Sequence, residues 1–206
     1  MKVEHYVVGW VETNCYFAIN EATSECIVID PGDDAAMLAS KIDEKGYKPV
    51  AILLTHGHFD HATGANELAE RYHVKIYVHE DDFDLMADPQ RNCCGMMGRR
   101  IVNRADEKLR DRQVLQLAGF EIQVIHTPGH TPGGVCFYFE KEGVLFAGDT
   151  LFCESVGRTD FPGGSSSTLI RSIRDRLFVL PDLTIVYTGH GEPTQIGSEK
   201  KYNPFV

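Results

Sequence analysis

The sequence predicts a mixed α/β fold, in which β-sheets with mixed strand pairing are covered by helices. Short apolar runs rich in Val, Ile, Phe or Tyr recur along the chain, and Gly, Pro, Asp or Asn bound most of them. Such runs are typical of strands. Helical patterns lie between some of the runs, so that strands come first, helices and strands then alternate, and strands return at the end. This order favours sheets with helices packed against them.

Both kinds of element can be placed by residue number. The first expected helix, capped by Asp33 or Asp34, ends at Gly46. The second covers 64–72, and the third covers 165–180 with a serine run at its start. The apolar positions of these helices are Met37, Leu38, Ile42, Leu68, Tyr72, Leu169, Ile173, Leu177 and Leu180. The expected strands cover residues 3–8, 15–19, 26–29, 50–54, 74–78, 120–125, 135–139, 144–146 and 185–187.

Composition limits the class of protein. The chain has 206 residues, which suits one domain over 1–206 with a substantial core. No stretch approaches the roughly 20 apolar residues of a membrane helix, so no membrane partner is expected. Because the N-terminus lacks a signal-peptide pattern, the expected location is the cytoplasm. The net charge of −10 argues against nucleic acid as a partner. Composition does not indicate an oligomeric state.

The six cysteines are interpreted as structural rather than bridged. None forms a CxxC pair and the chain is not a small secreted one, so a disulfide framework is not expected. Cys15, Cys26 and Cys136 lie in apolar strand-like runs, as small buried hydrophobes do. Cys93 and Cys94 lie in an irregular stretch, where a structural role is favoured over a reactive one.

That irregular stretch, residues 88–113, has the weakest pattern in the chain and is expected to be a surface excursion or a lid. It is also the most basic part of an acidic protein. A solvated face is favoured over a substrate-facing role. Its arginines are Arg91, Arg99, Arg100, Arg104, Arg110 and Arg112.

The segment LTHGHFDHATG (53–63) places three of the nine histidines and one aspartate within six positions. It follows a predicted buried strand, and ligand sites gather at such strand ends in α/β folds. Because His56, His58 and Asp60 alternate, an extended or tightly turning backbone could aim all three one way, whereas His61 points elsewhere. Imidazoles and carboxylates are good zinc ligands. A purely structural role is disfavoured, because buried unpaired polar groups are costly.

Three further side chains occur in matching contexts. His130 lies in HTPGHTPGG, Asp149 in FAGDTLF and His190 in YTGHGEPT, each after a predicted strand and each beside a glycine. Strand ends on one edge of a sheet can converge in space. The pattern therefore predicts a metal site built from segments that are distant in the sequence.

Taken together, HGHFDH, PGHTPG, GDTLF and TGH resemble the metallo-β-lactamase superfamily, and are close to its glyoxalase II branch. The resemblance covers nearly the whole chain in order. It implies a four-layer αββα sandwich with a dinuclear metal site between the sheets. By that likeness, the first metal ion is held by His56, His58 and His130, the second by Asp60, His61 and His190, and both by Asp149.

The sequence departs from the superfamily pattern at two points, and these narrow the choice of subgroup. Classical cephalosporin-cleaving members often have Cys at a second-site position, where this chain has Asp149, so β-lactamase activity is disfavoured. Classical glyoxalase II has a C-terminal helical domain that grips glutathione, for which a chain ending at Val206 is expected to have no counterpart. The fit is better to short glyoxalase II-like bacterial hydrolases, whose signature resembles VGRTDFPGG (156–164) and NPF (203–205).

The resemblance implies a metal-dependent hydrolase, and within it a thioesterase acting on S-acylglutathione-type thioesters. Its cofactors would be two divalent ions, expected to be zinc with iron or manganese as alternatives. The ions would share a hydroxide that attacks the carbonyl of a small-molecule thioester. Thiolate leaves readily, so no strong general acid is needed. Asp60 is the expected catalytic residue, because it can orient the hydroxide.

Other polar residues are given supporting roles. Arg158 is a candidate clamp for a substrate carboxylate, and equally a candidate for an ion pair with Asp160 or another carboxylate. His79 is expected to be a surface histidine rather than a partner of metal ligands. Thr55 and Thr150 are expected to support ligands by hydrogen bonds.

Two other functions compete with the hydrolase. Persulfide dioxygenases share the scaffold and a GRTDF-like segment, and their single iron would be held here by His56, His130 and Asp149. A metal-binding module without catalytic activity ranks last, because an open dinuclear site is more than storage requires.

Overall fold

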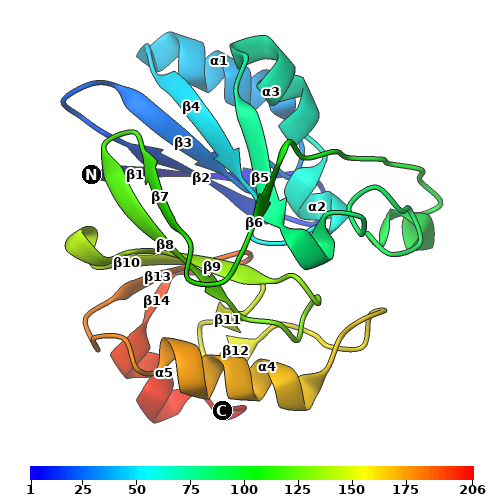
Figure 1. The fold of residues 1–206 in the computed structure, drawn as a ribbon, viewed down its shortest axis with the longest axis vertical. Coiled ribbons are helices and arrows are strands. Elements are labelled where there is room, and N and C mark those ends of the chain that lie inside the picture. The colour runs from blue at the N-terminus through cyan, green and yellow to red at the C-terminus, as the bar shows by residue number, and fades with distance from the viewer.

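The computed structural model describes the backbone of residues 1–206 and every side chain other than that of Met97. Two six-stranded sheets pack face to face (Figure 1). Helices α1 (Ala35–Lys45) and α3 (Ala65–Tyr72) cover the outer face of the first sheet. Helices α4 (Ser166–Ser172) and α5 (Ile196–Tyr202) cover the outer face of the second. This four-layer αββα arrangement confirms the predicted fold class.

The first sheet begins with antiparallel strands and continues with parallel ones. Pairing is antiparallel as far as β3 and parallel from β3 to β6. Helix α1 connects β3 to β4, and the short α2 (Phe59–Ala62) and α3 connect β4 to β5. In spatial order the strands are β1 (Lys2–Val8), β2 (Thr13–Ile19), β3 (Glu25–Ile29), β4 (Lys48–Leu53), β5 (Lys75–His79) and β6 (Glu107–Leu109).

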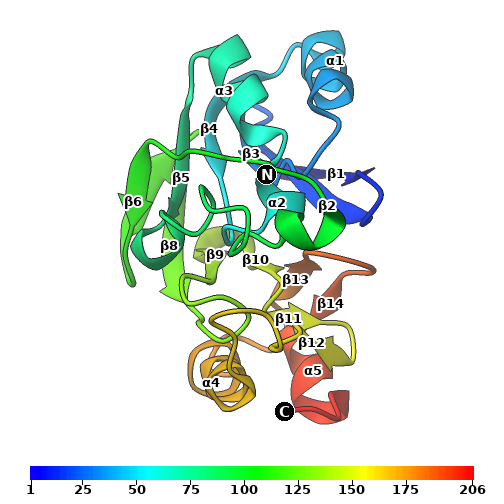
Figure 2. The same cartoon turned by 90° about the vertical axis from the view of Figure 1, so that its right-hand side faces the viewer.

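The second sheet is antiparallel except for one pair, β10 with β13. In spatial order its strands are β14 (Thr194–Gln195), β13 (Ile185–Thr188), β10 (Val144–Gly148), β9 (Val135–Phe139), β8 (Phe120–His126) and β7 (Val114–Leu117). A separate hairpin of β11 (Leu151–Phe152) and β12 (Ser155–Val156) follows β10. Figure 2 shows this hairpin on the same side of the molecule as α2.

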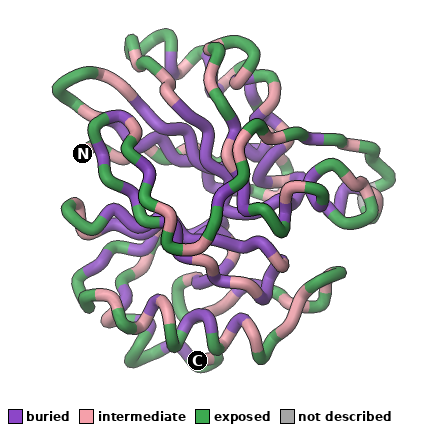
Figure 3. Tube along the Cα trace, viewed as in Figure 1, coloured by how far each residue is buried: buried purple, intermediate pink, exposed green. Residues whose placement is uncertain are grey.

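Three apolar layers hold the sandwich together. One lies between α1, α3 and the first sheet, and another lies between the second sheet, α4 and α5. The central layer lies between the sheets, where Phe137, Phe139 and Leu53 are fully buried. Figure 3 shows the buried strands running through the centre and the exposed turns outside them. Strands covered on both faces explain the near-continuous apolar runs in the sequence.

The structure contains all nine predicted strands and the three predicted helices, with two differences at helix ends. Asp34 occupies the N-cap position of α1, but its carboxylate accepts from the Gly9 N–H instead of capping the helix. Helix α4 continues as a π-helical turn that ends at Leu177, so the prediction of helix as far as residue 180 was wrong. Sequence patterns missed the short strands and α2 and α5, which are too brief to show a period.

The excursion at 88–113 is a surface segment, as predicted, although it also contributes β6. A 3₁₀ turn, Cys94–Met97, lies in its middle. Its six arginines are exposed, whereas Cys93 and Cys94 beneath them are buried. Cys15, Cys26 and Cys136 are buried as predicted. Among the described residues, no helix combines the length and apolar character needed to cross a membrane.

The central layer is expected to carry much of the stability. Phe137 is fully buried between the sheets, so Phe137→Ala should lower the free energy of unfolding by about 3–5 kcal/mol. Val179→Ala, at a side chain that is 72% exposed, should change it by less than about 0.5 kcal/mol. Urea unfolding followed by circular dichroism measures both. Equal effects of the two substitutions would contradict this description of the core.

Candidate metal centre

The seven candidate ligands lie where strands end. His56 and His58 follow β4, His130 lies between β8 and β9, Asp149 directly follows β10, and His190 follows β13. Asp60 and His61 lie in α2, the single helical turn after His58. These strand ends meet at one edge of the sandwich, so ligands from segments up to 134 residues apart in the sequence lie close together. The ring of His56 contacts that of His130, and the ring of His61 contacts that of His190.

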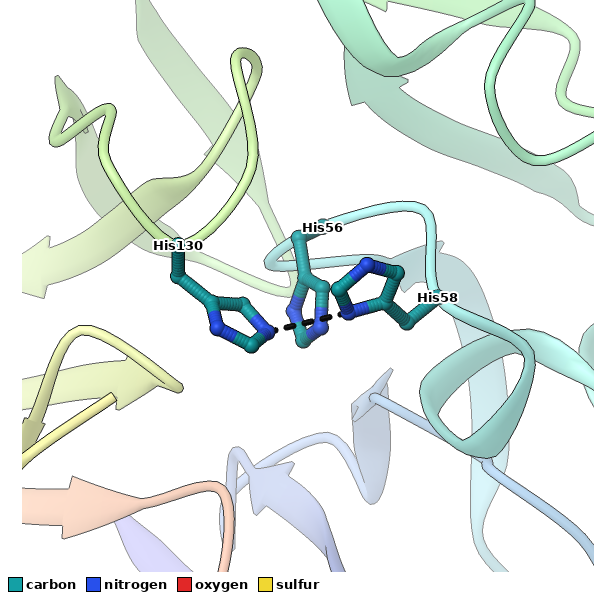
Figure 4. A group of neighbouring side chains, drawn as sticks. All are labelled: His56, His58 and His130. Carbon is teal, nitrogen blue, oxygen red and sulfur yellow. Dashed lines mark hydrogen bonds between the residues drawn. The ribbon is translucent and has the colours of Figure 1, made fainter. Parts of the chain in front are cut away.

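The first group consists of His56, His58 and His130, whose ligand atoms lie within 4.8 Å of one another. Figure 4 shows the three rings turned toward one another from two different loops. The Nδ1 of His58 is 2.9 Å from the Nε2 of His130. All three rings are at least 96% buried by relative accessibility, and the Nε2 of His56 has no hydrogen-bond partner among the described atoms. A buried imidazole nitrogen whose lone pair faces two further imidazole nitrogens can bind a metal cation.

The second group consists of Asp60, His61 and His190. The Nε2 of His190 is 3.4 Å from Oδ2 of Asp60 and 3.4 Å from the Nε2 of His61. Asp60 therefore groups with His61 and His190, as the resemblance implies, and not with His56 and His58, as the alternation of these residues suggested. The alternating pattern fails because the backbone enters α2 at Phe59 and ceases to be extended.

Asp149 lies between the two groups. Its Oδ1 is 3.3 Å from the Nε2 of His61, and its Oδ2 is 3.5 Å from the Nε2 of His130 and 3.6 Å from that of His190. A Cβ at Gly189 would lie 2.1 Å from Oδ1 of Asp149, so only glycine fits there. One carboxylate thus faces both histidine groups, which is the arrangement needed to bridge two ions.

A buried carboxylate that the sequence analysis missed, Asp30, fixes two of the histidines. It accepts from the Nδ1–H of His61 at 2.9 Å and from the hydroxyl of Thr55 at 2.6 Å. Since that hydroxyl donates to Asp30, its oxygen accepts from the Nδ1–H of His56 at 3.1 Å. Both rings therefore present Nε2 lone pairs to the centre. The signal for Asp30 was its place directly after the apolar run of β3, the same context that identified Asp149.

Backbone carbonyls orient two other rings. The Nδ1–H of His130 donates to the carbonyl of Arg158 at 2.7 Å, and that of His190 donates to the carbonyl of Glu12 at 3.2 Å. His58 differs, because its Nε2 is buried without a partner and its Nδ1 faces the centre. Four histidines thus offer Nε2 and one offers Nδ1.

A second buried carboxylate, Asp82, ties two ligand loops together. It accepts from the Gly57 N–H at 2.9 Å, between His56 and His58. It also accepts from the Thr131 hydroxyl and the Gly133 N–H, both at 2.7 Å, in the loop that carries His130. Burial raises the pKa of Asp82 above its ordinary value, although these three hydrogen bonds oppose the shift. Asp82 also lies outside the set found from the sequence.

The protonation states suit cation binding. Burial and the neighbouring imidazoles lower the pKa of His56 well below its ordinary value, and burial together with His130 lowers the pKa of His58 to about 3. Both rings are therefore neutral, which is the form that ligates metals. At His61 burial lowers the pKa, but Asp149, Asp60 and Asp30 raise it well above its ordinary value. These carboxylates favour a positive charge at the His61 ring, which either a proton or a metal ion can supply.

The VGRTDF and NPF segments have identifiable structural roles. A Cβ at Gly157 would lie 1.8 Å from the backbone oxygen of Asp149, so glycine permits this close approach. The amide of Asn203 donates to the Ser155 carbonyl, and buried Glu199 accepts from that amide and from the Glu154 N–H. These contacts anchor the β11–β12 hairpin beside Asp149.

Some supporting residues differ from expectation. Arg158 forms a bidentate ion pair with Asp160 through bonds of 2.8 and 2.7 Å, which is the structural alternative of the two considered. Thr55 supports His56, as predicted, but Thr150 contacts the Thr127 hydroxyl and is not hydrogen-bonded to a candidate ligand among the described residues.

The expectation that His79 would be a surface residue was wrong. It is buried and stacks on His126 with ring centroids 4.1 Å apart. With Asp81 these two histidines form another close group of possible ligands. However, the His79 Nδ1 accepts from the Asp81 N–H, and the His126 Nε2 donates to the Pro132 carbonyl. The nitrogens that face this group are already hydrogen-bonded, so it is not assigned as a metal site.

Comparison with known proteins agrees with the geometry. The family model described as the metallo-beta-lactamase superfamily matches residues 8–190. The chain belongs to the metallo-β-lactamase superfamily. The probable metallo-hydrolase YqgX of Bacillus subtilis is 36% identical over 208 residues, which cover 100% of this chain and 98% of that protein. The hydroxyacylglutathione hydrolase GloC of Haemophilus influenzae is 37% identical over 215 residues, covering 100% and 98%.

Several solved structures have the same fold as this chain. BLEG-1 B3 metallo-β-lactamase has a TM-score of 0.95 and 38% identity, with 99% of each chain covered. TTHA1623 in a di-iron-bound form has a TM-score of 0.88 and 35% identity, with 98% and 100% covered. ETHE1 from Myxococcus xanthus has a TM-score of 0.84 and 27% identity, with 99% and 84% covered. The chain is a metal-dependent hydrolase of this superfamily, whose fold implies divalent metal ions.

Asp149 is expected to be essential for metal occupancy. Zinc-loaded protein should hold about two ions per chain, the number typical of two-metal sites. Asp149→Asn keeps the shape of the side chain but removes the charge that faces both histidine groups, so occupancy should fall at both positions. Asp84→Asn, at an exposed aspartate, is the matched control. Elemental analysis after dialysis measures the ratio, and full occupancy in Asp149→Asn would contradict the bridging position.

Asp30 is expected to control metal affinity without touching the ion. Asp30→Asn removes the charge that orients His61 and Thr55, and should weaken zinc binding by about 10- to 100-fold. Asp34→Asn is the matched control, because Asp34 has the same positive φ of 51° and lies outside the centre. Competition with a chromophoric chelator measures both affinities. Unchanged affinity in Asp30→Asn would show that the buried carboxylate does not orient the ligands.

Proposed function

We propose that this protein is a glyoxalase II-like thioesterase that hydrolyses S-acylglutathione-type thioesters. The observation that carries the proposal is the convergence of the two ligand groups and Asp149 beside one open cavity of about 510 Å³. Five of the seven residues line this cavity, namely His58, Asp60, His130, Asp149 and His190, whereas His56 and His61 are buried. A similar protein of nearly the same length, GloC, is named a hydroxyacylglutathione hydrolase. An open dinuclear site of this kind suits hydrolysis rather than metal storage.

The ligand set favours two divalent ions, which we propose to be zinc. When bound, a pair of such ions lowers the pKa of a shared water toward neutrality and polarises a carbonyl oxygen. TTHA1623 was solved with two irons, so iron is the first alternative and manganese the second. Imidazole and carboxylate ligands accept all three metals.

The chain's own residues supply positioning and proton handling. Asp60 lines the cavity, its Oδ2 lies 3.4 Å from the hydroxyl of Thr13, and neighbouring His61 and His190 lower its pKa despite burial. It stays ionised and can therefore accept a hydrogen bond from the attacking water and orient it. Water adds to the carbonyl carbon and its two protons pass to solvent, the C–S bond breaks, and the products are a carboxylate and a thiolate, which solvent then protonates to the thiol. Thiolate leaves without protonation, so no further acid is required.

A mononuclear-iron persulfide dioxygenase is the second candidate, because ETHE1 has the same fold. Such a site would use His56, His130 and Asp149 and would leave Asp60, His61 and His190 without a ligand role. Their close grouping favours the dinuclear hydrolase. BLEG-1, named a B3 metallo-β-lactamase, makes a β-lactam ring the other substrate to test.

Zinc-loaded protein is expected to cleave S-lactoylglutathione with release of free thiol. His58→Ala should lower kcat/KM by about a thousandfold or more, because it removes a ligand of the ion that polarises the carbonyl. His73→Ala, at an exposed histidine after α3, is the matched control and should retain full activity.

The same samples decide between the candidates. Cleavage of a chromogenic cephalosporin but of no thioester would favour the β-lactamase. Oxygen consumption by an iron-loaded sample, with one iron per chain, would favour the dioxygenase. Fully metallated protein that hydrolyses no ester, thioester or phosphodiester and consumes no oxygen would indicate a binding module.

A further inference from the structure

We propose that the substrate carries an uncharged apolar group next to its scissile bond. This group would lie against a wall formed by Trp10, Val11, Met96 and Phe161, which we call the apolar wall. The proposal rests on the proposed function, because it assigns the class of thioester that the metal centre would cleave.

The apolar wall comes from three separate segments that meet over the metal centre. Trp10 and Val11 lie in the turn between β1 and β2, Met96 lies in the excursion after β5, and Phe161 follows β12. All four line the cavity that contains Asp60 and Asp149. Val11 and Phe161 also pack against buried Phe59 and Cys93, so the wall has a fixed base. Three segments therefore contribute apolar surface to a single cavity.

Two members of the wall are unusually exposed. Trp10 is 59% exposed and Met96 is 61% exposed, although both are large apolar side chains. Grouped exposed apolar surface often marks a place where a ligand or partner binds. Here it borders a cavity with polar groups at its base, the usual composition of a small-molecule site. The wall therefore fits an apolar part of the substrate rather than a charged one.

The charges around the cavity support the same conclusion. Arg158 is the single Lys or Arg among the described residues that line it. Its guanidinium is bound to both oxygens of Asp160 and lies 4.0 Å from the centre of the Phe161 ring. A substrate carboxylate at the wall would thus lack a free cationic partner, and desolvating it would be costly. An apolar group meets no such penalty.

Binding can be measured apart from hydrolysis. Trp10 is the single tryptophan of the chain, so its fluorescence reports directly on the wall. The probes are S-hexylglutathione and S-methylglutathione, thioethers that the zinc-loaded protein cannot hydrolyse. The hexyl compound should shift the emission to shorter wavelength and bind about tenfold or more tightly, as expected for five partly buried methylenes. Equal dissociation constants for the two probes would overturn the proposal.

A matched pair of valines locates the contact. Val11→Ser should raise the dissociation constant of S-hexylglutathione by about threefold or more while leaving that of S-methylglutathione unchanged. Val7→Ser, at a 53% exposed valine of β1 that does not line the cavity, should change neither. If Val11→Ser does not fold, as judged by circular dichroism, Val11→Ala replaces it. Equal effects at Val11 and Val7 would overturn the assignment of the wall.

Hydrolysis then separates this proposal from the function on which it rests. With the thiol held constant, S-hexanoylglutathione should be cleaved with a kcat/KM about tenfold or more above that of S-acetylglutathione. Equal, His58-dependent cleavage of the two would refute the apolar preference and leave the thioesterase intact. Preferential binding of the hexyl probe without cleavage of any thioester would support the wall and refute the thioesterase.

Discussion

The buried carboxylate of Asp30 is the interaction on which the arrangement of the centre depends. It lies at the end of β3 with a positive φ of 51°, a backbone conformation that Asp tolerates better than most residues. From there it accepts the Thr55 N–H at 2.8 Å, the Thr55 hydroxyl and the Nδ1–H of His61. Because the Thr55 oxygen accepts from His56, one carboxylate sets the orientation of a histidine in each of the two groups. The remaining candidate ligands face these two oriented rings.

The β-sandwich holds the segments around Asp30 in place, so the hydrogen bonds of its carboxylate can orient the histidines. Its apolar layers fix the strand ends, and the loops that carry the ligands are tied to each other rather than left free. Asp82 joins the loop of His56 and His58 to that of His130, and Glu199 and Asn203 anchor the hairpin beside Asp149. Ligands held on rigid elements with a second layer of hydrogen bonds are pre-organised for metal binding.

The sequence predicted the fold class well because its strands are buried on both faces and appear as dense apolar runs. It also identified the seven side chains that converge. Four of them lie in one short segment after a buried strand, and the other three each lie beside a glycine after a later strand. What it missed has a physical reason. Asp30 and Asp82 act through hydrogen bonds to segments 25 or more residues away, and no local pattern records such contacts. The turn of α2 is four residues long, too short for periodicity to separate Asp60 from the extended His56 and His58. The burial of His79 depends on stacking with His126, which lies on the other sheet.

We propose that one edge of the sandwich holds two metal ions in two histidine groups joined by Asp149. Anomalous diffraction from crystals of the zinc-loaded protein tests it most directly. Two peaks are expected, one among His56, His58 and His130 and the other among Asp60, His61 and His190, with an Asp149 oxygen beside each. His58 should coordinate through Nδ1 and the other four histidines through Nε2. A single peak at full zinc occupancy, or a peak between His79, Asp81 and His126 instead, would contradict the account.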